Sequence, residues 1–496
     1  MRYPILLSFI LLFSANIAAD DNTVTIYSSA QPGAISPELY RPTPGRGRYT
    51  GTVPGFAVVR HERDYDIARG YSQLRVSDVA ALIDPTTVMF KSMTHPDTRV
   101  LEQSFEFDLV SNQKLLQRYI GQEIIVEQLR GDIVDEIRGT LLGASDGLIL
   151  QSGDGSIQTL HSYIRLRFPQ LPGGLITRPT LVWSLDSRHG GNHLSRIAYQ
   201  TSGMTWWADY NAVLDESRGC KLDISAWVSI INQSGASYPG ASLKLIAGDV
   251  HRAQVPGRFE RRVVAEMAMA DAAPTGFSEK EFFEYHLYTL GRKTDLPDNS
   301  TRQIELFPTA QSVDCEKEFV FAPTLGYQYY GGQYLDQNYG RTTQADVKVY
   351  LRYQNEEDNQ LGIPMPAGRV RVSQLDSSDE SLEFIGEDTI DHTPKDEEIM
   401  IQMGNAFDVV GERVQTDFRI DSRSRQLWES FEVKLRNHKS TDARVTVLDS
   451  MYRSANWTVQ SASHEYTKTN AHGIRFDVPV KKDGETVITY TVHYKW

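Results

Sequence analysis

The fold class is decided by the stretch FEVKLRN (Phe431–Asn437), in which apolar and charged residues alternate. After a short polar segment, a second alternating run, RVTVL, follows at Arg444–Leu448. A period of two places successive side chains on opposite faces of a pleated strand. Each run therefore predicts a strand with one face in a core and one in water, and the two runs together predict a hairpin.

The same pattern occurs twice more upstream. Trp227–Asn232 is followed by Ser242–Ile246, and Val349–Asn355 is followed by Arg369–Val372. In all three copies the first run ends at Asn, which tolerates the left-handed backbone of tight turns. Recurring hairpins are typical of antiparallel β-sandwiches, and their irregular spacing argues against a solenoid. We predict a mainly β, multi-domain protein of antiparallel sandwiches with little helix.

A small unit is predicted ahead of the sandwiches. Ser111–Tyr119 has apolar residues at helical spacing and predicts a short helix. Five short strands separated by Gly and Asp turns follow: Glu123–Gln128, Ile137–Leu142, Gly147–Gln151, Ile157–Leu160 and Ile164–Phe168. They suggest a small SH3/Sm-like barrel, and a plain antiparallel meander fits equally well.

These patterns divide the chain into five segments, with a Pro-Gly junction at Leu171–Gly174. A connecting helix is predicted at Arg261–Ala273, which is rich in helix formers and ends before Pro274. The predicted segments are a signal peptide (1–19), an N-terminal β region (20–110), the barrel-like unit (111–172), a first β-sandwich region (173–275) and a C-terminal β-sandwich region (276–496).

The N-terminus predicts export. Arg2 precedes an apolar run, Ile5–Phe13, and small residues lead to Ala18–Ala19 just ahead of two aspartates. Charge, apolar core and small-residue exit form a secretory signal peptide, with cleavage expected near Ala19. The run is shorter than the roughly 20 residues that span a bilayer, so no transmembrane segment is expected after cleavage. We expect a periplasmic or secreted protein.

The amino-acid composition limits the kinds of binding partner that we expect. The chain has 51 basic and 64 acidic residues, a net charge of −13. An acidic protein repels nucleic acid and anionic lipid surfaces, so neither is expected as a main partner. The only cysteines are Cys220 and Cys315. In an oxidising compartment they could form a disulfide, or they could be two buried thiols.

No motif predicts catalysis, a cofactor or a metal site. His189 and His193 are four residues apart, but the two glycines between them make a helix improbable, so we predict a solvated hairpin turn. Asp154 lies in a Gly-Asp-Gly turn and not in a calcium loop. The acidic runs 356–358 and 396–398 could flank a glycosidic bond, but charge runs of this kind are typical of solvated loops.

A tyrosine-rich stretch, Gly326–Tyr334, is the strongest surface signal. Tyrosines with intervening glycines form flat amphipathic surfaces that stack on sugars or contact proteins, although cross-strand packing of the rings is an alternative. Trp206 and Trp207 are adjacent and should point to opposite faces of a strand, one in the core and one exposed. The candidate ligand-binding residues are Tyr327, Tyr329, Tyr330, Tyr334 and Trp206.

Several stretches together resemble a known family. They are Ile83–Val88, Arg178–Trp183, Tyr199–Tyr210, Leu243–Val250, Glu284–Tyr288 and Leu361–Gly368. As a set they are similar to a bacterial exported family catalogued as domain of unknown function 4139, distantly mucoidy-inhibitor-like, with a family core at about 178–496. Unlike the mucoidy-inhibitor-like members, this chain has no long coiled-coil insertion. The resemblance implies a β-rich envelope protein, and the family has no assigned activity.

These observations favour an exported cell-envelope protein that acts as a non-enzymatic binding or structural/assembly module for a protein or glycan partner. The alternative is a hydrolase acting on an envelope polymer, which would need perturbed carboxylates or a histidine pair in a cleft. The sequence sets no oligomeric state.

Overall fold

Strands dominate a computed structural model of the protein, which confirms the predicted mainly β class. It describes residues 21–27, 35–36, 39–40, 53–130, 133–217, 219–248, 277–282, 285–324, 326, 334–343, 345–376, 378–379 and 381–496. The predicted signal peptide and the helix at 261–273 lie outside these residues. Helix α1 (Asn112–Arg118) forms where predicted, and the Ser111 hydroxyl caps it by accepting from the Lys114 N–H.

The first sheet joins segments from three predicted regions. Its strands, in spatial order, are β16 (Phe277–Phe282), β17 (Tyr285–Leu290), β15 (Tyr238–Ala247), β1 (Asp21–Tyr27), β2 (Phe56–Ile67), β12 (Gly191–Ser202) and β4 (Ile83–Ser92), with β18 (Thr294–Leu296) paired to β15. Strand β1 runs parallel to β15 and antiparallel to β2. Strands from the predicted regions 20–110, 173–275 and 276–496 are therefore joined by backbone hydrogen bonds in one sheet.

A three-stranded sheet continues from the first one. Its order is β3 (Gly70–Val76), β11 (Thr180–Ser187) and β5 (Arg99–Glu106). Because β11 is the central strand, nearly all of its residues are buried. Four connections carry the chain between the two sheets: β2 to β3, β3 to β4, β4 to β5 and β11 to β12.

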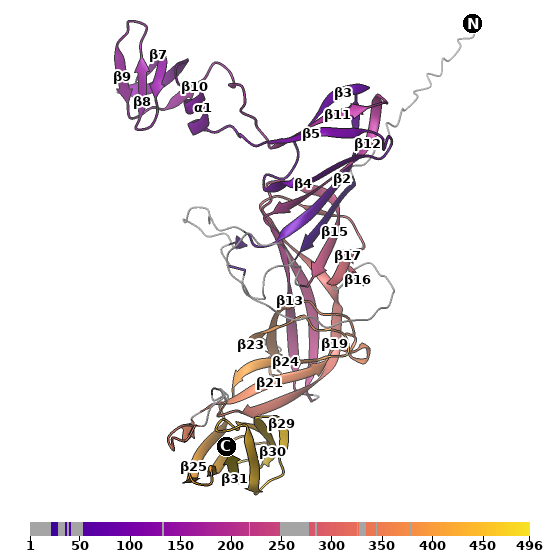
Figure 1. The fold of residues 1–496 in the computed structure, drawn as a ribbon, viewed down its shortest axis with the longest axis vertical. Coiled ribbons are helices and arrows are strands. Elements are labelled where there is room, and N and C mark those ends of the chain that lie inside the picture. The colour runs from indigo at the N-terminus through magenta and orange to yellow at the C-terminus, as the bar shows by residue number, and fades with distance from the viewer. Residues whose placement is uncertain are drawn as a thin grey trace, which may run out of the picture.

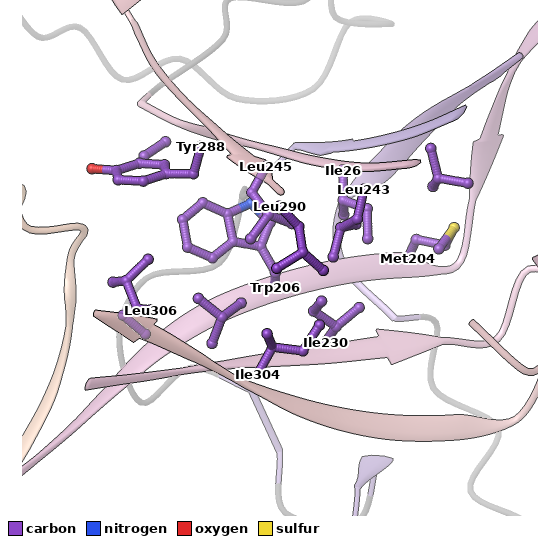
Figure 2. Close-up of a cluster of buried hydrophobic side chains, with 14 of the residues drawn as sticks. Ile26, Met204, Trp206, Ile230, Leu243, Leu245, Tyr288, Leu290, Ile304 and Leu306 are labelled. Carbon is purple, nitrogen blue, oxygen red and sulfur yellow. The ribbon is translucent and has the colours of Figure 1, made fainter. Parts of the chain in front are cut away.

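The first sheet packs on a ten-stranded sheet. The latter contains β23 (Leu382–Ile390), β22 (Gly368–Leu375), β13 (Met204–Asp215), β14 (Lys221–Asn232), β19 (Ser300–Phe321), β27 (Ala443–Ser450), β30 (Gly473–Val480), β29 (Thr467–Asn470), β21 (Val347–Gln354) and β24 (Glu398–Asn405). Figure 2 shows Trp206 between the strands, with Leu243 and Leu245 on one side and Ile230 and Ile304 on the other. This is the larger of the cores.

The C-terminal sandwich closes a second core. Its five-stranded sheet contains β20 (Thr342–Thr343), β25 (Val409–Asp421), β26 (Gln426–Asn437), β31 (Gly484–Lys495) and β28 (Asn456–Ala462). The alternating residues of β26 are buried at every second position, as its sequence predicts. They pack against β27 and β30 of the ten-stranded sheet, at the bottom of Figure 1.

The small unit lies apart from the main body in Figure 1. Its five-stranded antiparallel sheet has the order β10 (Arg165–Arg167), β6 (Glu123–Arg130), β7 (Ile133–Gly143), β8 (Leu148–Gln151) and β9 (Ile157–Leu160). It has its own core, which includes Tyr119, Val126 and Leu141. The SH3/Sm-like barrel is not confirmed, because β9 and β10 remain edge strands that do not pair with each other among the described residues.

The three predicted hairpins are wrong in a consistent way. In each copy both strands form, but they do not pair with each other: β14 and β15 belong to different sheets, as do β26 and β27, and β21 and β22 have different neighbours. The turns after β14 and β26 therefore carry the chain to another sheet, and the turn after β21 carries it to a different part of the ten-stranded sheet. Alternation predicts the strands but carries no information about which partner each one takes.

The asparagines at these turns act through their side chains. The buried Asn437 amide donates to the Thr441 carbonyl oxygen (2.9 Å), and its Oδ1 accepts from the Lys439 N–H (3.0 Å). Asn232 and Asn355 are equally buried and bond to the backbone of their own turns. None of the three has a positive φ. Their role is thus to satisfy buried backbone groups at a sheet crossing, not to permit a left-handed turn.

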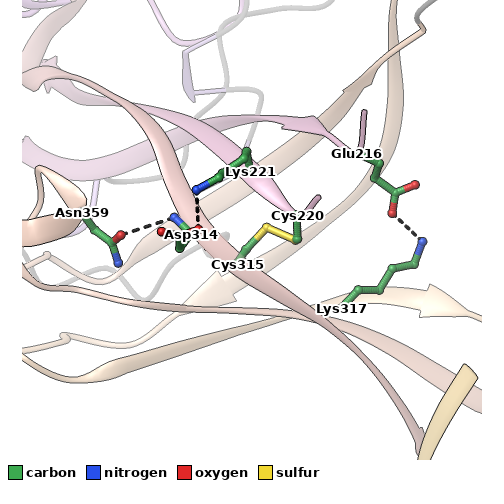
Figure 3. Close-up of a disulfide and its surroundings, with 7 residues drawn as sticks. All are labelled: Glu216, Cys220, Lys221, Asp314, Cys315, Lys317 and Asn359. Atoms are coloured by element: carbon green, nitrogen blue, oxygen red, sulfur yellow. Dashed lines mark hydrogen bonds and ion pairs between the residues drawn. A yellow bond between two sulfur atoms is a disulfide. The ribbon is translucent and has the colours of Figure 1, made fainter. Parts of the chain in front are cut away.

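A disulfide joins Cys220 to Cys315, with Cα atoms 5.0 Å apart. It lies where β19 leaves its partner β14 and continues to β21 and β27 of the C-terminal half. Figure 3 shows it beside the ion pair between Glu216 and Lys317 (2.7 Å). The bond therefore fixes the junction between the two cores.

Candidate functional site

The two adjacent tryptophans are both buried. Trp206 is 1% exposed and donates from Nε1 to the Ile246 carbonyl oxygen (3.2 Å). Trp207 points to the opposite face, is 8% exposed and donates to the Asp209 carboxylate (2.7 Å). The prediction that one of them is exposed is wrong, because residues that include Val53 cover the second face. Trp206 presents no surface to a ligand.

The tyrosine-rich segment, here called the tyrosine loop (residues 326–340), is described in its second half. Tyr334 is partly exposed, and its ring stacks on Tyr339 with centroids 4.7 Å apart. Leu335, Asp336 and the two residues that follow are exposed. Three predicted binding residues lie outside the described residues: Tyr327, Tyr329 and Tyr330.

A buried arginine of the C-terminal sandwich holds this half of the tyrosine loop. Arg453 is 1% exposed, and its guanidinium pairs with the buried Glu429 carboxylate at 2.6 Å. It also donates to three main-chain carbonyl oxygens of the loop, those of Tyr334 (2.8 Å), Asp336 (2.7 Å) and Tyr339 (2.7 Å). One side chain thus fixes the loop backbone at three points.

A second buried arginine holds the end of the tyrosine loop. Arg413 pairs with the Asp449 carboxylate at 2.7 Å, and neither side chain is exposed. Its Nη1 donates to the Gly340 carbonyl oxygen (2.9 Å). Gly340 has φ +72°, and a Cβ there would collide with the Tyr452 ring. Glycine therefore fits this position without backbone strain and without displacing the Tyr452 ring.

Arg413 and Arg453 with their carboxylate partners are here called the arginine pair. Burying these charged groups is energetically costly. Burial raises the pKa of Glu429, against the lowering influence of the adjacent Arg453. Desolvation opposes the charge on Arg413 as well, but Asp449 and Tyr490 outweigh it and raise its pKa. Replacing a buried ion pair by apolar residues is often neutral or stabilising. The arginine pair is therefore better explained by the loop that it holds than by net stability.

Sequence reasoning missed both arginines. Arg413 lies on β25 opposite the core residue Val433, at an inward position of an alternating strand. Arg453 lies in the segment between β27, which ends at Ser450, and β28. The sequence offered no clear signal for either residue, because the positions in phase with Arg413 include Gly411 and Gln415 and Arg453 lies outside a strand.

A second cluster forms where the β4–β5 and β11–β12 corners meet. Ring nitrogens of His95 and His189 and a carboxylate oxygen of Asp97 all lie within 4.8 Å of one another. The His95 ring stacks on His189 (centroids 4.4 Å, 14°) and contacts His193 (4.6 Å). The prediction of a solvated hairpin turn is therefore only half right, because His189 is exposed but His193 is fully buried and β11 and β12 do not pair.

The other chemical candidates are turns. The Asp154 side chain accepts from the Ser156 N–H and hydroxyl within its own turn. The two acidic runs lie side by side, because Asn355 exchanges backbone hydrogen bonds with Asp396 and Glu397. Nearly all of their carboxylates are exposed, as expected for solvated loops.

No family model matches the chain, and no curated protein matches it. Among the described residues, no helix has the length and apolar character needed to cross a membrane.

Proposed function

We propose that this chain is an exported cell-envelope protein that binds a protein or glycan partner through the tyrosine loop without catalysing a reaction. The proposal includes export through the leader at 1–19 and kinship with the family of domain of unknown function 4139.

The observation that carries the proposal is the anchoring of the tyrosine loop. The arginine pair donates to four backbone carbonyls between Tyr334 and Gly340. The side chains from Leu335 to Asn338, within this anchored stretch, are exposed. A loop fixed before it meets its partner loses less conformational entropy on binding, which raises affinity. A disulfide at the junction of the two cores supports an oxidising compartment.

The test compares partner binding by the wild type, by a variant with three tyrosines of the loop replaced, and by a control variant with two exposed tyrosines outside the loop replaced. Residues 20–496 are immobilised and exposed to a glycan array and to envelope extract of the source cells. In the loop variant Tyr327, Tyr329 and Tyr330 are each replaced by Ser. In the control Tyr71 of β3 and Tyr163 of the small unit, which are 71% and 40% exposed, are replaced by Ser.

We expect the wild type and the control to retain the same glycan or protein, and the loop variant to lose at least tenfold in affinity. Equal retention by all three proteins would place binding elsewhere and overturn the role of the loop. Cleavage of an envelope polymer by the wild type would overturn the non-enzymatic proposal and favour the hydrolase.

A further inference from the structure

We propose that His95, Asp97 and His189 form a binding site for a divalent first-row transition-metal ion of the Zn²⁺ class. The site is independent of the tyrosine loop and of the function proposed above.

The donor set suits such an ion. Two imidazole nitrogens and one carboxylate oxygen are ligands that Zn²⁺ and its neighbours accept, whereas Ca²⁺ and Mg²⁺ prefer oxygen ligands alone. Zn²⁺ bonds to His and Asp are roughly 2.0–2.2 Å long, so tetrahedral ligand atoms lie about 3.4 Å apart. The three donor atoms already lie within 4.8 Å, and His189 Nε2 is 3.9 Å from Asp97 Oδ2. Because the His189 and Asp97 side chains are about half exposed, they have room to rotate. The His189 ring must turn out of its stack on His95, since a bound ion lies in the plane of each imidazole that holds it.

The neighbouring groups hold the donors in place. His193 cannot compete as a ligand, since its Nδ1 lies 3.1 Å from the Ser92 hydroxyl and its Nε2 lies 3.2 Å from the His189 carbonyl oxygen. Its buried ring instead contacts the His95 ring, with centroids 4.6 Å apart. The Ser92 hydroxyl also accepts from the His95 N–H (3.0 Å). The buried side chains of Ser92 and His193, which are hydrogen-bonded to each other, thus hold the backbone of both ligand-bearing turns.

The position gives the ion a structural task. His95 and Asp97 lie between β4 of the first sheet and β5 of the three-stranded sheet, and His189 lies between β11 and β12 of the same two sheets. An ion shared by these turns would lock the corner between the sheets. Strand β5 leads directly towards α1 and the small unit (Figure 1). The ion would therefore stiffen the base from which that unit extends.

The test uses untagged residues 20–496, stripped with EDTA, because a histidine tag would bind the same metals. Zn²⁺ is titrated by calorimetry, and Co²⁺ is added to follow its visible ligand-field absorption. The variants are His95→Ala, His189→Ala and Asp97→Asn. The matched control is His161→Ala, which removes an exposed histidine of the small unit. Thermal unfolding of each metal-free variant checks that it folds like the wild type.

We expect one Zn²⁺ per wild-type chain, with Ca²⁺ unable to displace it. Affinity should fall at least tenfold in each ligand variant and stay unchanged in the control. Zn²⁺ should also raise the midpoint of thermal unfolding of the wild type and the control only. Equal Zn²⁺ affinity in the wild type and in correctly folded His95→Ala and His189→Ala would overturn the site, and so would the absence of binding by the wild type.

Discussion

The two cores bury polar groups in opposite ways. Between the first and ten-stranded sheets, His61 Nδ1 lies 2.7 Å from Asn22 Oδ1 and its Nε2 lies 3.0 Å from the Tyr199 hydroxyl. Because the Asn22 amide donates to the Pro239 carbonyl oxygen, the neutral imidazole satisfies every partner: Nδ1–H donates and Nε2 accepts. The C-terminal sandwich instead buries the charged arginine pair.

The two buried polar clusters, the His61 hydrogen-bond network and the arginine pair, have different roles. Burial and the nearby Arg63 lower the pKa of His61 to about 4, so this core stays uncharged at neutral pH. Its hydrogen bonds join strands to one another. The hydrogen bonds of the arginine pair leave the core and end on the tyrosine loop. One centre holds a sheet together, and the other holds a surface in position.

The largest expected effect comes from breaking the charged centre on one side. Arg453→Met leaves Glu429 buried without its ion partner, which should lower the free energy of unfolding of the C-terminal sandwich by about 3–5 kcal/mol. Urea unfolding followed by tryptophan fluorescence measures the loss. The double variant Arg453→Met/Glu429→Met should recover much of it, and a double variant as unstable as the single one would contradict the explanation.

The stabilisation that His61 gives to the first core should be lost at acidic pH. The folded-state pKa of His61, about 4, lies below the unfolded value of 6.5, so its stabilisation is complete above pH 6.5 and is lost as the pH falls to 4. The difference of 2.5 units corresponds to about 3 kcal/mol. Urea unfolding of wild type and His61→Gln at pH 7 and pH 4 isolates this contribution. A wild type that loses no more stability than the variant over this range would refute it.

Replacing the turn asparagines should lower the free energy of unfolding of both cores to the same extent. Asn437→Ala and Asn232→Ala each leave buried backbone carbonyls without a donor, and each should cost about 2 kcal/mol. Matched urea titrations compare the two variants. An effect near zero at both positions would show that the side-chain amides are dispensable at the sheet crossings.

The smallest effect concerns the stacked rings. Tyr339→Leu removes the stack on Tyr334 and should cost about 1 kcal/mol. Phe56→Leu removes the comparable stack on Tyr27 in the first sheet, where the centroids are 4.5 Å apart, and should cost a similar amount. Thermal unfolding compares them. A much larger loss for Tyr339→Leu would mean that the loop contributes more stability than its contacts indicate.

The sequence predicts strands well and their partners poorly. The alternation in β14, β21 and β26 correctly gives three strands and their inward faces, because burial on one face imposes a period of two. It gives neither the pairing of β1 with β15 nor the crossings after the turn asparagines, since these depend on contacts between distant segments. Helix α1 was recognisable because the helical spacing of its apolar residues is a local signal.

The candidate sites divide along the same line. The first part of the tyrosine loop, Gly326–Tyr334, was recognisable because its composition is unusual within nine residues. The arginine pair and the histidine cluster were not, because Arg453 and Glu429 meet only after β25, β26 and β27 have folded, and His95 meets His189 across 94 residues of sequence. These residues come together only through the fold, so the sequence alone does not reveal the sites that they form.

Hydrogen exchange tests most directly whether the arginine pair fixes the tyrosine loop. In the wild type the Tyr339 N–H bonds to the Asp336 carbonyl oxygen and the Tyr334 N–H bonds to that of Arg453. We predict that both amides are protected, and that Arg453→Met removes their protection while that of β2 and β12 is unchanged. Unprotected amides in the wild type, or equal protection in the variant, would contradict the account.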